Sequence, residues 1–92
     1  MLTVEVTAED IYAGEPGDPC GCAFALAFAR RFPGSHPYAN ADGVAFEWRG
    51  QQIDLYLPDP VIAFIDAFDN GEPVEPATFE LWPEEELTAT AD

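Results

Sequence analysis

The chain has 92 residues, of which 18 are Asp or Glu and only three are basic, so its formal net charge is −15. This length fits one small domain, and its 48% hydrophobic and 13% aromatic content excludes an acidic disordered tail, which is poor in such residues. The charge argues against direct binding of nucleic acid, because phosphate contacts need Lys and Arg, and against docking on an anionic membrane. It favours a basic partner, with a solubility role as the alternative interpretation of the acid excess.

Targeting segments are not evident in the sequence. The longest uncharged run, residues 19–29, is about half the length of the roughly 20 residues that a transmembrane helix requires. The first residues do not join a basic region to an apolar stretch, so we expect no signal peptide and a cytoplasmic location. In a reducing compartment, Cys20 and Cys22 are expected to be thiols.

The N-terminal part predicts a strand, a short helical turn and a longer helix. Apolar and polar residues alternate over residues 2–6, which is typical of a strand with one apolar face. Residues 7–10 resemble a capping box that starts a helical turn ending at Gly14. Asp18 is suited to the N-cap of a following helix that continues through Arg31. This helix is apolar nearly all round, so we expect it to be buried on two sides or to lie at an interface. Its main apolar stripe consists of Phe24, Phe28 and Phe32.

The middle of the chain predicts a β-hairpin. Residues 44–48 and 53–57 alternate in hydrophobicity, and Arg-Gly at 49–50 is a plausible two-residue turn. Pairing Trp48 with Gln51 places the apolar residues of both segments on one face, so the register is consistent.

The C-terminal part predicts a second helix and a last strand. Asp59 is the expected N-cap of the helix and Gly71 its C′ residue. Residues 77–82 alternate again, and residues 84–92 are expected to be a frayed acidic tail after a single domain of residues 1–83. The apolar stripe of this helix consists of Val61, Phe64, Ile65 and Phe68.

The order of these elements is β-α-β-β-α-β, with an extra helical turn after the first strand. It predicts an α+β fold with a small antiparallel sheet and two main helices on one face, as in ferredoxin-like folds. A different α+β arrangement is the alternative.

Catalytic or metal-binding motifs are weak. Three soft ligands for a metal are present in the sequence: Cys20, Cys22 and His36. His36 lies in an expected polar loop at 34–43. A structural zinc site needs four ligands and would therefore also require a carboxylate such as that of Asp18. A redox pair at a helix start is also conceivable, but we favour packing in a buried first turn. The chain has no phosphate-binding or calcium loop. We therefore expect no enzyme activity, no cofactor and no metal.

The distribution of acidic residues is the most informative feature. Asp66 and Asp69 lie near the C-terminal end of the second helix, where the helix dipole disfavours anions, and such uncompensated charge often marks a functional surface. If the apolar side chains of the strands face the helices, the opposite sheet face is open, acidic and aromatic. That face is expected to carry Thr3, Glu5, Glu47, Asp54, Tyr56, Thr78, Glu80 and Trp82.

Two parts of the chain resemble small actinobacteriophage (mycobacteriophage-type) proteins. One is the loop Gly-Glu-Pro-Gly-Asp-Pro-Cys at 14–20, which leads into an Ala-rich helix, and the other comprises residues 57–71 and 74–81. The resemblance covers about residues 3–82. In those proteins the loop often reads Cys-x-x-Cys-Pro, whereas this chain has Cys-x-Cys. The resemblance implies a phage origin and a cytoplasmic host setting, and it supplies no activity.

These observations predict a non-enzymatic binding protein that presents an acidic surface to a basic host protein, such as a nucleic-acid-binding or defence protein. The carboxylates would occupy the positions of phosphates, and binding would weaken with salt. A structural or assembly protein that dimerises through its apolar first helix is the alternative. The candidate partner-binding residues are Glu5, Glu47, Asp54, Tyr56, Glu80, Asp66 and Asp69.

Overall fold

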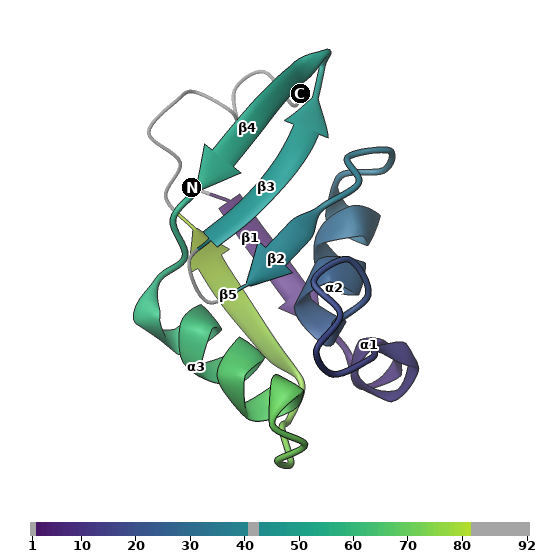
Figure 1. The fold of residues 1–92 in the computed structure, drawn as a ribbon, viewed down its shortest axis with the longest axis vertical. Helices are drawn as coiled ribbons and strands as arrows, with labels where there is room; N and C mark the ends of the chain where they lie inside the picture. Colours follow the sequence, from purple (N-terminus) through teal and green to yellow (C-terminus); the bar gives the residue numbers. More distant parts are fainter. Residues whose placement is uncertain (1, 41–42, 82–92) are drawn as a thin grey trace.

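The computed structural model describes residues 2–40 and 43–81, so Trp82 and the expected acidic tail at 84–92 lie outside the described residues. This part of the chain contains helices and antiparallel strands, which confirms the α+β class (Figure 1). The helices are α1 (Ala8–Ala13), α2 (Ala23–Arg31) and α3 (Asp59–Asp69). The strands are β1 (Leu2–Val6), β2 (Tyr38–Asn40), β3 (Gly43–Trp48), β4 (Gln51–Leu55) and β5 (Ala77–Leu81).

The described strands form two sheets and not the single sheet that we expected. β1 pairs with β5, while β2, β3 and β4 form a separate antiparallel sheet in that order. The strands of the two sheets run in crossing directions in Figure 1. β2 and β4 occupy both edges of β3, so β3 pairs with neither β1 nor β5.

The β3–β4 hairpin confirms the predicted register. Trp48 lies opposite Gln51, and Phe46 lies opposite Ile53. Both turn residues have positive φ, 54° at Arg49 and 80° at Gly50. This is the backbone of a type I′ turn, whose twist matches that of the two strands.

β2 is the element that the sequence did not predict, because it lies in the segment expected to be a polar loop. Two backbone hydrogen bonds connect this segment to its neighbours: the Ala39 N–H donates to the Pro19 carbonyl (2.8 Å), and the Glu47 N–H donates to the Ser35 carbonyl (2.8 Å). The strand has only three residues, which is too short for an alternating hydrophobic pattern to be recognised.

The phenylalanine stripe of α2 joins the two sheets in one core. Phe24, Phe28 and Phe32 are fully buried. The Phe24 ring contacts Phe79 of β5 with a centroid separation of 6.3 Å, whereas the Phe28 ring contacts Phe46 of β3 at 4.7 Å. The helix that was expected to be buried on two sides therefore packs on both sheets.

The start of α2 differs from the prediction. The helix begins at Ala23 and its N-cap is Cys22, whose Sγ accepts a hydrogen bond from the Ala25 N–H (3.5 Å). Asp18, the expected N-cap, instead uses its Oδ1 to accept a hydrogen bond from the Cys20 N–H (3.0 Å). Its side chain therefore stabilises a turn before the helix.

α3 also begins one residue away from the expected position, since Pro58 is the N-cap and Asp59 is helical. Its C-terminal end confirms the prediction. Gly71 has a φ of 77°, its N–H donates to the Phe68 carbonyl (3.1 Å), and the Glu72 N–H donates to the Ala67 carbonyl (2.9 Å). These two bonds form a Schellman motif, which needs a residue that tolerates positive φ at C′.

α1 confirms the capping box and adds an ion pair to it. The Asp10 carboxylate accepts a hydrogen bond from the Thr7 N–H (2.8 Å), while the Thr7 hydroxyl accepts one from the Asp10 N–H (3.2 Å). Arg30 of α2 donates to both oxygens of Asp10, at 2.7 and 3.0 Å, and to the Glu5 carbonyl at 2.7 Å. Burial raises the pKa of Asp10, but the bonds from Arg30 and Thr7 outweigh it and leave this pKa below its ordinary value of 3.8.

Replacing Asp10 with Asn is expected to lower the free energy of unfolding by about 2 kcal/mol at neutral pH, because charge-assisted hydrogen bonds are lost. A depressed pKa stabilises the fold above the unfolded-state value and loses that contribution as the pH falls through the folded-state value. The difference between wild type and variant should therefore shrink below about pH 4. Urea unfolding over pH 3–7 measures it, with the exposed Glu9→Gln as control. A pH-independent difference would contradict this account.

Candidate partner-binding surface

The sheet of β2, β3 and β4 has one face on the core and one open face, which we call the outer face. Val44 and Phe46 are buried on the core side. The alternation of β3 places Ala45 on the outer face, and the strand register puts it directly between Tyr38 of β2 and Asp54 of β4. These three residues therefore form one row across the sheet.

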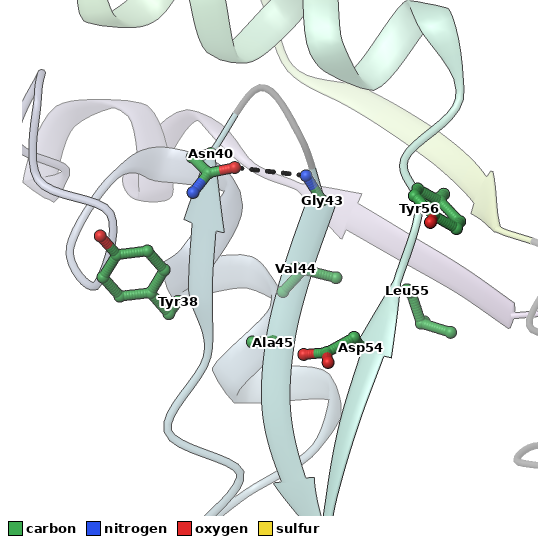
Figure 2. A pocket seen from close by; sticks show the side chains of 8 residues that line it. All are labelled: Tyr38, Asn40, Gly43, Val44, Ala45, Asp54, Leu55 and Tyr56. Atoms are coloured by element: carbon green, nitrogen blue, oxygen red, sulfur yellow. Dashed lines mark hydrogen bonds between the residues drawn. The ribbon is translucent and has the colours of Figure 1, made fainter.

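A second row and a third row complete the outer face. Asn40 of β2 lies opposite Gly43 of β3, and its Oδ1 accepts a hydrogen bond from the Gly43 N–H (3.3 Å). Tyr56 follows the last residue of β4 on the other side of Gly43 (Figure 2). On the opposite side of the first row, the exposed Glu47 lies beside the exposed Gln52.

The outer face is hollowed along β3 into a groove with a volume of about 410 Å³. Figure 2 shows that the small residues of β3 lie at its centre, with Tyr38 on one side and Tyr56 on the other. The Asp54 carboxylate points toward Ala45 in this view. The lining residues are Tyr38, Asn40, Gly43, Val44, Ala45, Asp54, Leu55 and Tyr56.

Residue size explains the hollow. Gly43 has no side chain because the backbone of β4 approaches closely there, and a Cβ would lie 2.5 Å from the Leu55 carbonyl oxygen. Ala45 extends only a methyl group. Tyr38 on β2 and Tyr56 directly after β4, in contrast, are open to solvent, with exposed fractions of 49% and 89%.

Three of the predicted partner-binding residues meet on the outer face. Asp54 and Tyr56 line the groove, and Glu47 is exposed one row away from Asp54. The sequence missed the residues from β2 and the two small residues of β3. Gly43 and Ala45 alternate with the large apolar residues of the hairpin, so their size was the available signal, whereas nothing in the sequence indicated that Tyr38 would lie beside them.

The other predicted residues lie elsewhere. Glu5 and Glu80 are exposed on the sheet of β1 and β5, so the prediction of one continuous acidic sheet face was wrong. Asp66 is exposed on α3. Asp69 uses its Oδ1 to accept a hydrogen bond from the Gly17 N–H (2.9 Å), which connects α3 to the loop before α2. Its unfavourable place near a helix C-terminus thus has a structural explanation.

The basic residues of the chain do not line the groove. Arg30 is paired with Asp10. Arg31 lies over the Phe32 ring, 4.7 Å from its centroid, and Arg49 lies 6.0 Å from the Trp48 ring centroid. A cation that entered the groove would therefore meet the carboxylate of Asp54 without competition from an arginine among the lining residues.

The two cysteines occupy different environments. Cys22 is buried, and burial raises the pKa of its thiol, whereas Cys20 is exposed. Across residues 2–40 and 43–81, no group of three or more His, Cys, Asp or Glu side chains is arranged to hold a metal ion.

We expect the native chain to react rapidly with one equivalent of a thiol reagent, at Cys20, because thiolate formation and access are both disfavoured at Cys22. A second equivalent should react only in denaturant. Mass spectrometry after alkylation measures both, with Cys20→Ser as the control that should leave the native chain nearly unlabelled. Equal rates at the two thiols in the native state would contradict the burial of Cys22.

No protein-family model, curated protein or solved structure matches the chain. In the part of the chain that the structure describes, no helix combines the length and hydrophobicity needed to cross a membrane.

Proposed function

We propose that this chain is a non-enzymatic acidic binding protein of phage type, which engages a basic host protein through the outer face of β2, β3 and β4. The observation that carries the proposal is the groove, where two exposed tyrosines flank Asp54 and no basic side chain is among the lining residues. This groove lies on a chain with a net charge of −15.

The combination of residues suits a protein partner better than a nucleic acid. Tyrosine is enriched in protein interfaces and among the residues that contribute most to binding energy. Sheets that stack RNA bases on aromatic residues also need basic side chains for the phosphates. On the outer face the charged groups are instead the carboxylates of Glu47 and Asp54, which repel phosphate.

Competition with nucleic acid follows from this charge. Carboxylates that contact the basic surface of a nucleic-acid-binding protein occupy the positions of phosphates. Complementary charge accelerates association and makes it sensitive to salt. The complex should therefore form rapidly at low salt and weaken as ionic strength rises.

The homodimer alternative loses the observation that suggested it. α2 was expected to need a partner because it is apolar nearly all round. The three phenylalanines of its stripe are fully buried, and they contact residues of β3 and β5 in the same chain. The phenylalanine stripe of α2 is thus covered within one molecule, whereas Leu26 and Ala29 on its other side are half-buried.

Affinity capture tests the proposal. The immobilised chain is incubated with nuclease-treated lysate of an actinobacterial host at low and at high salt, and bound proteins are identified by mass spectrometry. We expect a basic, nucleic-acid-binding protein that is retained at low salt, lost at high salt and displaced by added DNA or RNA. The absence of such a protein, or a partner that nucleic acid does not displace, would overturn the proposal.

A further inference from the structure

We propose that the groove over Gly43 and Ala45 receives an arginine side chain of the partner, so that the surface recognises an arginine-bearing segment and not basic charge in general. This inference rests on the proposed function and names the chemistry that the outer face selects. It follows from the shape of the groove and from the groups in it that are free to bind.

The spacing of the row suits one extended side chain. Tyr38 and Asp54 lie on either side of Ala45, and neighbouring strands are about 4.8 Å apart, so their backbones are separated by roughly 10 Å. The methyl group of Ala45 leaves the space between them open. An aliphatic stem can lie in this space, in contact with Ala45 and Gly43.

Three groups of the groove, the rings of Tyr38 and Tyr56 and the Asp54 carboxylate, make neither ring contacts nor ion pairs with the rest of the described chain. Neither Tyr38 nor Tyr56 contacts another ring there, while eight other ring pairs are packed together. Within residues 2–40 and 43–81, the Asp54 carboxylate accepts no hydrogen bond and makes no ion pair. Two aromatic faces and one carboxylate are thus available at one place.

These groups match a guanidinium better than an ammonium. Arginine presents a planar fork of N–H donors that can bind both oxygens of a carboxylate, and its plane stacks on aromatic rings. Asp54 supplies the carboxylate, and Tyr38 and Tyr56 supply rings on either side. Lysine offers a compact, strongly hydrated charge that gains less from such a site.

Isothermal titration calorimetry at physiological salt tests the inference with three short peptides of the same length, which contain arginine, lysine or citrulline at the same positions. We expect the arginine peptide to bind about tenfold more tightly than the lysine peptide, because only its guanidinium combines bidentate pairing with stacking. The citrulline peptide, whose side chain is uncharged, should not bind. Equal affinities for the arginine and lysine peptides would overturn the inference.

Ala45→Ile separates shape from charge. It fills the groove, leaves the net charge unchanged and places a residue that favours strands on the central strand. The arginine peptide should then bind no more tightly than the lysine peptide. A variant that keeps the wild-type preference for arginine would contradict the groove as the binding site.

Tyr56→Ala gives a second variant that does not depend on sheet packing, because this side chain is 89% exposed and lies after the end of β4. Its control is Tyr12→Ala, which removes an equally exposed tyrosine, 93% accessible, from α1. The preference for arginine should weaken in the first variant and persist in the second. Equal behaviour of the two variants would count against the role of Tyr56.

The peptide titrations and the affinity capture together distinguish failure of the arginine inference from failure of the proposed function. If every cationic peptide binds with an affinity that depends only on its charge, and a basic host protein is still captured at low salt, the proposed function stands and the arginine inference fails. If no cationic peptide binds and no basic protein is captured, both fail.

Discussion

Replacing Phe28 with alanine is expected to lower the free energy of unfolding by about 4 kcal/mol, because it removes a fully buried aromatic side chain and leaves a cavity. The ring lies 6.0 Å from Phe24, 5.1 Å from Phe32 and 4.7 Å from Phe46 between centroids, so it connects α2 to β3. Domains of this size are stable by roughly 5–14 kcal/mol. The variant should therefore be close to unfolding at 37 °C.

Urea and thermal unfolding, followed by circular dichroism, measure this effect. Phe28→Leu is the matched control: it keeps most of the apolar volume and should cost less than about 1.5 kcal/mol. If Phe28→Ala were as stable as Phe28→Leu, α2 would not pack between the two sheets as described.

Removing the carboxylates of the outer face is expected to have the second large effect, on the affinity for the basic partner. Neutralising the outer face in the double variant Glu47→Gln/Asp54→Asn should weaken the captured partner's affinity about tenfold at physiological salt, because both carboxylates face the basic surface. The same variant should reduce the salt dependence of binding, since fewer charges interact. Surface plasmon resonance at several salt concentrations measures both quantities.

The sheet of β1 and β5 provides the control. Glu5→Gln/Glu80→Gln removes two exposed strand carboxylates and the same amount of charge from the other sheet. This variant should bind within about twofold of wild type, because distant surface charges are screened. If both double variants lost the same affinity, binding would depend on net charge and not on the outer face.

The parts of the fold that were predicted correctly depend on short-range signals. The capping box at Thr7 and Asp10, the hairpin register around Arg49 and Gly50, and the C′ position of Gly71 are each determined by residues close in sequence. In each case a single backbone requirement or one hydrophobic pattern is enough to identify the feature.

The sheet arrangement could not be predicted in this way. It depends on β2, a three-residue strand that pairs with the adjacent β3 and whose Ala39 N–H also donates to the carbonyl of Pro19, which is distant in sequence. The N-cap of α2 was wrong for a related reason. Asp18 can cap either a helix or a turn, and the bond that it makes to Cys20 selects the turn.

The candidate site was predicted in part. Glu47, Asp54 and Tyr56 were found because the hairpin pattern places them on its polar side. Tyr38 was missed because its strand was missed. Glu5 and Glu80 were grouped with the others because alternation gives the face of a strand but does not say which sheet the strand joins.

An NMR titration of the ¹⁵N-labelled chain with the arginine peptide at physiological salt shows whether the outer face is the binding surface. We expect amide shift changes concentrated at β2, β3 and β4 and at Tyr56, with little change on β1, β5 or the exposed side of α3. Shift changes spread over all acidic surfaces, or centred on β1 and β5, would contradict this expectation.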